Sequence, residues 1–356
     1  MNEQSLNVSI LKSFPPVDEA AVDQLLQKEI AENPAKIVVL DDDPTGVQTV
    51  HDISVYTSWD KESMLAGFRE TGKVFYILTN SRGMTAEETT AAHREISENA
   101  AYASQVCGKP YLLISRSDST MRGHYPLETQ LLREGLEKRG QMADGEVLCP
   151  FFKEGGRFTI NNVHYVQQGD QLVPAARTEF AQDKSFGYTK SGIPEYIEEK
   201  TGGASRAEDV ICISLEDLRG CRYDSIEAQL LTARDFQKIC LNAVDYCDIK
   251  VFCVALYRAM KKGRVFLFRT AAGFVRTIAG ISEKPLLRRQ DMVSADTENG
   301  GIVVVGSHTK KTTEQLERLL ALPEAEAVEF DSDKVLDGDK AFYAEVKRCL
   351  RCEEAI

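Results

Sequence analysis

Three adjacent carboxylates, Asp41, Asp42 and Asp43, directly follow a short apolar run and precede a Pro-Thr-Gly sequence. Carboxylates this close repel one another, so the cluster is costly unless a cation or hydroxyl donors balance it. Such a group suits the hydroxyls of a polyol, a Mg²⁺ ion or the abstraction of a proton. Asp, Pro and Gly are also ordinary turn residues, and a capped turn is the alternative. Three carboxylates in a row favour a functional site.

Two further polar segments also follow apolar runs. Asn80 and Arg82 come after Val74–Leu78, and residues 115–124 (Ser-Arg-Ser-Asp-Ser-Thr-Met-Arg-Gly-His) come after Tyr111–Ile114. The guanidinium group of Arg binds a carboxylate or phosphate group through two parallel hydrogen bonds. Ser and Thr also cap helices, and most exposed Arg side chains are simply solvated. The convergence of three such segments indicates a binding site.

The elements that must position these segments are strands alternating with helices. Such alternation, with apolar β-branched runs typical of strands buried on both faces, predicts a parallel α/β fold. The predicted strands are Ile37–Leu40, Ile53–Tyr56, Val74–Leu78, Tyr111–Ile114, Val147–Leu148, Val210–Ile213, Val251–Ala255 and Ile302–Val305. Predicted helices include residues 18–32, 86–104 and 126–139. Ligands of open parallel sheets bind beyond the carboxyl ends of the strands, where the polar segments fall.

Three more segments are candidates. Residues 149–159 place a Gly pair before Arg157, which lets the backbone approach a ligand, although a β-hairpin loop explains the pair equally well. Residues 264–270 read as a strand with an Arg at its end. Residues 303–315 read as strand, small-residue turn and helix start, and the N–H groups of such a turn favour phosphate. The standard nucleotide, zinc-peptidase and α/β-hydrolase signatures do not occur in the sequence.

The pattern predicts two α/β domains of unequal size. An N-terminal helical extension covers residues 1–36, a large domain 37–285, a polar linker ending in two glycines 286–301, and a second domain 302–356. After the linker we expect strand 302–305, helix 312–321, strand 326–330 and a last helix. Two strands cannot bury both faces of a parallel sheet. We therefore expect the second domain to be partial.

The amino-acid composition limits the classes of partner that the protein can bind. The 356 residues include 43 Lys and Arg against 55 Asp and Glu, a net charge of −12, which argues against a nucleic-acid partner. The sequence has no apolar run of membrane-spanning length and no secretory signal at its start. Nine scattered cysteines fit reduced thiols in the cytoplasm. Cys349 and Cys352 lack the further ligands of a zinc site, so we expect two helix thiols. The sequence leaves open whether the protein forms a homo-oligomer.

In combination and order, the motifs resemble the four-carbon acid sugar kinase family from residue 37 onward. Asp42–Gly46 matches its motif D-D-x-T-G, and Asp118–Gly123 matches D-S-T-hydrophobic-R-G. Pro150–Arg157 and His164–Tyr165 match P-F-x-x-x-G-R with a following H-Y. Arg269–Phe274 matches Arg-Thr-Ala-x-x-Phe, and Gly306–Gln315 matches G-S-x-x-x-x-T-x-x-Q after a strand. Each motif alone is short, and the set together is specific.

The resemblance implies an N-terminal domain that binds the acid sugar and a C-terminal domain that binds ATP. The implied activity is phosphorylation of the terminal hydroxyl of a 3-oxo-tetronate, threonate or erythronate, with ATP and Mg²⁺. Asp43 and Asp42 are the implied catalytic residues, and an Arg would meet the substrate carboxylate. The implied substrate-binding residues are Thr45, Gly46, Asn80, Arg82, Asp118, Ser119, Arg122, Gly123, Arg157 and His164. Those implied for ATP are Gly306, Ser307 and Thr312.

The sequence departs from the family in one respect. Members continue with Gly-rich segments that cradle the ATP phosphates, and none follows before Ile356. The resemblance therefore also implies a partial nucleotide-binding domain, and it leaves open whether this chain binds ATP and is active. Two other classes stay open: a non-catalytic acid-sugar-binding protein, and a metal-dependent aldolase or dehydratase that uses the Asp cluster.

Overall fold

The computed structural model describes residues 4–293, 300–307 and 310–353. The chain divides into two compact units, Met1–Pro285 and Leu286–Ile356. The division falls at the residue where the predicted linker begins.

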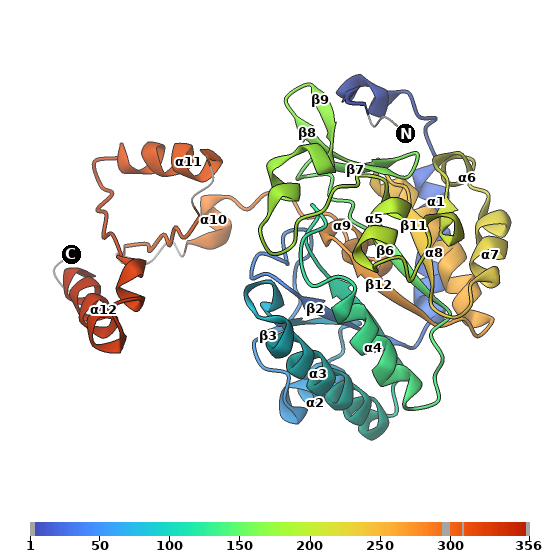
Figure 1. Ribbon diagram of the computed structural model, residues 1–356, viewed down its shortest axis with the longest axis horizontal. Coiled ribbons are helices and arrows are strands. Elements are labelled where there is room, and N and C mark those ends of the chain that lie inside the picture. The colour runs from blue at the N-terminus through green and yellow to red at the C-terminus, as the bar shows by residue number, and fades with distance from the viewer. Residues whose placement is uncertain (1–3, 294–299, 308–309, 354–356) are drawn as a thin grey trace. The chain divides into compact units, whose positions relative to one another are not determined.

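An eight-stranded, wholly parallel sheet forms the centre of the first unit, in the order β10-β11-β6-β12-β5-β2-β4-β3 (Figure 1). The strands are β2 Lys36–Asp41, β3 Val55–Tyr56, β4 Val74–Leu78, β5 Tyr111–Arg116, β6 Gly145–Cys149, β10 Ile211–Ile213, β11 Gln237–Leu241 and β12 Phe266–Thr270. β2 lies between β5 and β4, and all six of its residues are buried. Its central place explains why its sequence is a continuous apolar run.

Helices cover both faces of this sheet. They are α1 Glu19–Glu32, α2 Lys61–Arg69, α3 Ala86–Cys107, α4 Leu127–Glu137, α5 Ile193–Lys200, α6 Leu215–Arg219, α7 Tyr223–Thr232, α8 Tyr246–Lys261 and α9 Ala272–Ile278. Alternate residues of β2 belong to different cores: Val38 packs with residues of α2, α3 and α4, and Val39 with residues of α1 and α8. The parallel α/β fold predicted from the sequence is confirmed.

A smaller antiparallel sheet, which the sequence did not predict, is inserted after β6. Its order is β1-β9-β8-β7, with β1 Leu6–Asn7, β7 Arg157–Ile160, β8 Val163–Gln168 and β9 Gln171–Pro174. Phe152 and Arg157 pair across a tight turn in which Gly156 has a φ of +71°. The Gly pair therefore belongs to a hairpin loop. Because β1 pairs with β9 and α1 packs against α8, the N-terminal extension is part of the first unit.

One predicted strand of the first unit is wrong. Val251–Ala255 lies in α8, and its five side chains are fully buried. A helix buried on all sides gives the same apolar run as a buried strand, so periodicity cannot separate them. Conversely, β11 escaped prediction because it carries Lys238, which is buried in an ion pair with Glu146 of β6.

The second unit contains α10 Arg289–Met292, α11 Lys310–Leu320 and α12 Asp339–Glu353. The two helices expected after the linker are confirmed, and Cys349 and Cys352 both lie in α12, as expected. The strands expected at 302–305 and 326–330 are wrong, since the described part of this unit has no strand. Ile302 is 82% exposed and Val304 is 89% exposed. A strand is stable only with partner strands and a covered face.

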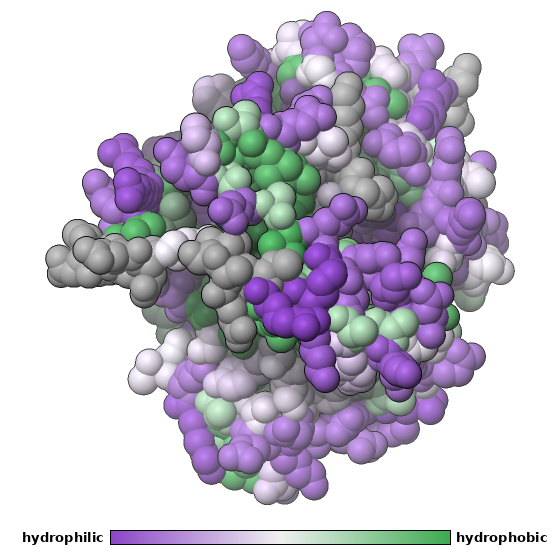
Figure 2. Space-filling view, turned by 90° about the vertical axis from the view of Figure 1, so that its left-hand side faces the viewer, coloured by the Kyte–Doolittle hydropathy of each residue, from purple (hydrophilic) through white to green (hydrophobic). Residues whose placement is uncertain are grey.

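Hydrophilic residues cover most of the face of the molecule in Figure 2, with smaller hydrophobic patches between them. Within the described ranges, no helix has both the length and the apolar composition to cross a membrane.

We predict that hydrogen exchange separates the two units. In the described structure, the backbone amides of Ile302–Val305 have no hydrogen-bond partner, whereas those of Lys36–Asp41 lie in the buried sheet. Amides open to water exchange far faster than those of a core strand. Mass spectrometry of peptic fragments should show residues 300–307 exchanging at the earliest times. Protection there equal to that of β2 would contradict the exposed state.

Candidate functional site

Three polar segments leave the central sheet at one edge. In the sheet register, Asp41 at the end of β2 pairs with Leu78 of β4 and Arg116 of β5. The N–H groups of Thr79 and Asn80 donate to the carbonyl of Asp41 at 2.9 and 3.2 Å. The residues after β2, β4 and β5 thus lie together at the carboxyl edge, where parallel sheets bind ligands.

Arginines balance the three carboxylates. Arg82 holds Asp42 through two hydrogen bonds, Nη2 to Oδ1 at 2.6 Å and Nε to Oδ2 at 3.2 Å. Its Nη1 also reaches Asp43 Oδ2 at 2.8 Å. Arg116 Nη1 donates to Asp41 Oδ1 at 3.0 Å. The repulsion expected from the sequence is therefore relieved within the first unit by two guanidinium groups.

The three carboxylates differ in their surroundings. Burial raises the pKa of Asp41 to about 7 and that of Asp42 to about 6, although Arg116 and Arg82 oppose the effect. Burial also acts to raise the pKa of Asp43, but hydrogen bonds from the hydroxyl and N–H of Thr45 outweigh it and lower that pKa below its usual value. The Asp43 side chain is 24% exposed and that of Asp42 is 3% exposed. Asp43 is therefore the ionised carboxylate that a ligand can reach.

A tight loop after β5 supplies the next charges. Asp118 accepts hydrogen bonds from Arg122 Nε at 2.7 Å and from its N–H at 3.3 Å. Burial acts to raise the pKa of Asp118, but the nearby Arg82 and Arg122 lower it. Beneath the loop, Arg269 of β12 donates to the carbonyl of Arg122 at 3.0 Å and pairs with Glu128 of α4. These contacts fix the backbone of the loop.

Two glycines of the motifs are required by close packing. A Cβ at Gly46 would lie 1.4 Å from Asp41 Oδ2. Gly123 has a φ of +109°, and a Cβ there would lie 2.9 Å from Arg269 Nη2. Gly46 and Gly123 thus shape the site by letting the backbone pass close to charged groups.

The model of one protein family, described as a sugar-binding N-terminal domain, matches residues 37–278. The chain belongs to this family. The resemblance seen in the motifs, to the four-carbon acid sugar kinase family, is confirmed at the level of the family. The sugar-binding domain is thus the first unit, with the strand-end cluster at its carboxyl edge.

Several solved structures are similar. A Bordetella bronchiseptica protein with a domain of unknown function (DUF1537), a domain-swapped dimer with bound citrate, is 20% identical with a TM-score of 0.50 over 68% of this chain and 55% of that one. The putative tRNA synthase of Salmonella typhimurium LT2 is 16% identical, with a TM-score of 0.48 over 69% of this chain and 55% of that one. At these identities the likeness shows the fold alone. The chain thus spans about 55% of the length of these neighbours. No curated protein matches the sequence.

His164 has a different role in the sugar-binding domain from the one the resemblance implied. The side chain is fully buried, its Nε2 lies 2.8 Å from the carbonyl oxygen of Ser119, and its Nδ1 lies 3.0 Å from the hydroxyl of Thr159. Burial lowers the pKa of His164 to about 4, although the hydrogen bond to Ser119 opposes the effect. His164 therefore supports the loop that carries Ser119 and is closed to a substrate.

Other predicted residues of the sugar-binding domain remain accessible. Thr45 and Asn80 are exposed. The partly exposed residues are Arg82, Asp118, Ser119, Arg122 and Arg157. Asn80 has a φ of 53° at the turn after β4. These residues and Asp43 are the ones that a ligand at the carboxyl edge can contact.

Two contributors to the site have no signal in the sequence, and a third has a weak one. Arg269 stands at the end of an apolar strand, where a structural role is one interpretation, and its contacts with Glu128 and the carbonyl of Arg122 agree with that role. Glu128 looked like an ordinary residue of a helix. The ring of Phe180, in the turn Glu179–Gln182, lies under the guanidinium groups of Arg122 and Arg157, 5.2 and 5.3 Å from its centroid. No local pattern marks Phe180, since its position depends on tertiary packing.

The residues implied for ATP lie in the second unit. Gly306 and Ser307 are exposed, and the hydroxyl of Thr312 donates to that of Ser307 at 3.1 Å. His308 and Thr309 of the same motif lie outside the described residues.

The donor set of the first unit does not fit a resident Mg²⁺ ion. Within the described ranges, no three His, Cys, Asp or Glu side chains are grouped to hold a metal. The oxygens of Asp41, Asp42 and Asp43 that would serve as ligands face Arg116 and Arg82.

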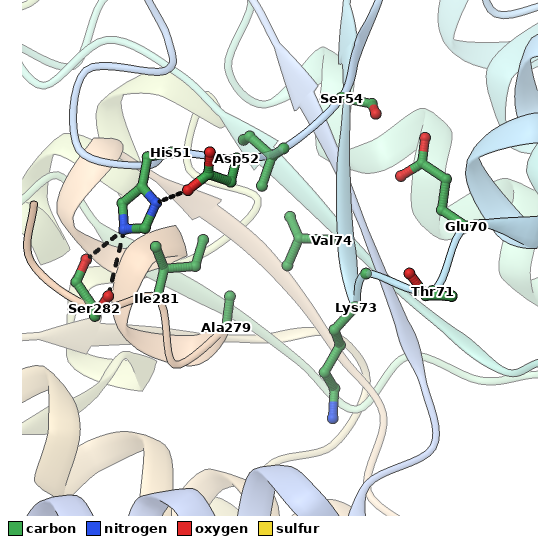
Figure 3. Close-up of a pocket in the computed structure, with 12 residues that line it drawn as sticks. His51, Asp52, Ser54, Glu70, Thr71, Lys73, Val74, Ala279, Ile281 and Ser282 are labelled. Atoms are coloured by element: carbon green, nitrogen blue, oxygen red, sulfur yellow. Dashed lines mark hydrogen bonds and ion pairs between the residues drawn. The ribbon is translucent and has the colours of Figure 1, made fainter. Parts of the chain in front are cut away.

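A cavity of about 550 Å³ lies at the opposite, amino edge of the sheet (Figure 3). His51 lies between Asp52 and Ser282, with Nδ1 2.7 Å from Asp52 Oδ2 and Nε2 3.2 Å from the carbonyl oxygen of Ser282. These contacts join the segment after α9 to the loop before β3. None of the site residues predicted from the sequence lines this cavity.

We predict that His164 makes the domain sensitive to acid. Its pKa of about 4 in the folded state lies below the ordinary value of 6.5, so the unfolded chain binds the proton more tightly. Stability is therefore lost as pH falls from about 6.5 to about 4, by up to about 3 kcal/mol. Urea unfolding of His164→Gln should show a shallower loss over this range than the wild type. Parallel losses in the two proteins would show that His164 does not titrate this way.

Proposed function

We propose that the first unit binds a four-carbon acid sugar at its carboxyl edge, and that the protein transfers the γ-phosphoryl group of ATP to the terminal hydroxyl of that sugar. The observation that carries the proposal is the placement of Asp43. This carboxylate is ionised, accessible and held by Thr45 and Arg82 beside a cluster of arginines. A sugar acid has both a hydroxyl for Asp43 and an anionic group for an Arg.

In the proposed reaction, Asp43 accepts a hydrogen bond from the terminal hydroxyl and orients its oxygen toward the γ-phosphorus. The new oxygen–phosphorus bond forms as the bond to the β-phosphate oxygen breaks, and ADP leaves. The hydroxyl proton passes to Asp43 and then to solvent. Phosphoryl transfer depends mainly on positioning and charge neutralisation, so a carboxylate of low pKa is adequate. Arg82 fixes the position of Asp43 and Asp42 fixes Arg82.

The proposal assigns ATP to the second unit, with Gly306, Ser307 and Thr312 as its contacts. Mg²⁺ would arrive on the ATP phosphates, because this ion is commonly held by substrate phosphates with few protein ligands. Since the chain spans about 55% of the length of its structural neighbours, this part of the proposal concerns the whole protein.

Two findings from the comparisons agree with the proposal. The family is that of a sugar-binding domain, and the similar Bordetella bronchiseptica structure holds citrate, an anionic hydroxy acid. The same structure is a domain-swapped dimer, which supports a homo-oligomer here. A cytoplasmic location is part of the proposal, on the basis of the scattered cysteines.

The alternatives differ in what they need from the Asp cluster. A metal-dependent aldolase or dehydratase needs free carboxylate oxygens, and those of Asp41 and Asp42 bind Arg116 and Arg82. A non-catalytic acid-sugar-binding protein needs the same site as the kinase. A measurement of ATP turnover distinguishes the kinase from the non-catalytic binding protein.

We predict that Asp43→Asn keeps acid-sugar binding and loses turnover. Loss of a carboxylate that accepts the proton costs about 10²–10⁴-fold in kcat. The assay is run on the whole protein, to which the ATP part of the proposal applies. It measures ADP release with threonate, erythronate or a 3-oxo-tetronate, beside calorimetric binding of the same acids. The exposed Asp170→Asn is the matched control and should behave as wild type. Normal turnover in Asp43→Asn would show that Asp43 only shapes the turn and takes no part in the reaction. Acid binding without ADP release by the whole wild-type protein would favour the binding protein.

A further inference from the structure

The arginines of the carboxyl edge are paired with carboxylates, with one exception. Within the described ranges, no carboxylate oxygen lies at ion-pair distance from Arg157, the first residue of β7. The paired ones are Arg82 with Asp42, Arg116 with Asp41, Arg122 with Asp118, and Arg269 with Glu128. Arg157 is therefore the surplus cation of the cluster.

The surroundings of Arg157 leave its donors short of acceptors. Its Nη1 donates to the carbonyl of Gly155 in the hairpin loop. Its Nε is buried and, in the described part of the chain, has no hydrogen-bond partner. The carboxylates of Asp118 and Glu179 attract Arg157 electrostatically, but both lie beyond ion-pair distance. Nη2 also has no hydrogen-bond partner in the described part of the chain. Because Nε is buried and the residue is partly exposed, an acceptor from outside the chain would reach the exposed part of the guanidinium group.

Phe180 and Arg122 complete the environment of Arg157. The guanidinium groups of Arg122 and Arg157 lie 5.2 and 5.3 Å from the centroid of the Phe180 ring, within the range of cation–π contacts. Arg122 also faces Asp183, with Nη1 3.8 Å from Oδ2. The ring thus holds two planar cations near one another without giving either a hydrogen-bond acceptor.

We propose that Arg157 is the residue that receives the carboxylate of the acid sugar, with Phe180 holding its guanidinium in place and Arg122 forming the neighbouring wall. This inference rests on the proposed function and assigns the anionic end of its substrate. A planar guanidinium fork matches the two oxygens of a carboxylate. Phosphate presents a similar edge, so the same subsite could serve a phosphate group, and the experiment separates the two anions.

The test compares a charged ligand with a neutral one. Threonate and threitol differ in the group at one end, carboxylate or hydroxymethyl. In the full chain, Arg157→Gln should weaken threonate binding by about 10- to 100-fold, the effect expected of a charge-assisted hydrogen bond, and leave threitol binding unchanged. The exposed Arg177→Gln, from the same insertion, is the control and should bind both as wild type. Inorganic phosphate should compete with threonate weakly.

A second measurement separates a ligand-binding Arg from a structural one. Arg157→Gln removes an unpaired charge, so the Tm without ligand should stay at or above that of the wild type. At pH 8, above the pKa of about 7 that burial gives Asp41, Arg116→Gln leaves this carboxylate buried without its cation and should lower the Tm clearly. A marked fall in Tm for Arg157→Gln would show that the chain itself uses the charge, and would overturn the inference.

The outcomes distinguish this inference from the proposed function. Threonate binding that is equal in the wild type and Arg157→Gln would overturn the role of Arg157 and leave the proposed function standing. Failure of the wild type to bind any four-carbon acid would overturn the proposed function, and the carboxylate assignment with it. Phosphate binding that is tighter than threonate binding and lost in Arg157→Gln would assign the subsite to phosphate and overturn the carboxylate assignment.

Discussion

A carboxylate that leaves water at the end of a buried strand needs a cation close by, and the carboxyl edge of the first unit is organised around this requirement. The side chain of Asp42 is 3% exposed and that of Asp41 is 2% exposed. Removing one partner of such a buried pair costs about 3–5 kcal/mol, because the other charge is then left without compensation. Arg82 and Arg116 meet this need from the neighbouring strands.

The rest of the domain depends on these pairs. Gly46 and Gly123 are glycines because charged side chains occupy the space where a Cβ would lie. Arg269 joins the loop after β5 to α4 through Glu128, and His164 supports the same loop from the antiparallel sheet. The pairs thus combine structure with function, since they hold Asp43 in the position where an ionised carboxylate remains open to a ligand.

The sequence predicted those parts of this arrangement that depend on local order. Val74–Leu78 forms the strand expected, and the polar segments after β2, β4 and β5 meet because parallel strands end at one edge. The strand predicted at Val251–Ala255 is wrong because all five side chains are buried within α8, so this stretch has no polar residue that would show the helical period. Ile302–Val305 has a strand-like sequence but no partner strand in the described residues.

The site was less predictable than the fold. Motifs supplied the residues, but not which arginine pairs with which carboxylate, and that pairing separates Arg157 from the others. His164 matched its motif and yet faces the interior, because burial is decided by the inserted antiparallel sheet. Phe180 had no signal at all, since its contacts join three segments that lie far apart in the sequence.

The most direct test of this account is the location of a bound acid sugar on the full chain, measured by hydrogen exchange with and without threonate. The account predicts that threonate slows exchange in residues 41–46, 79–82 and 117–124, at the carboxyl edge. Slower exchange around His51, Lys73 and Ser282, at the cavity of the amino edge, with no change at the carboxyl edge, would contradict it.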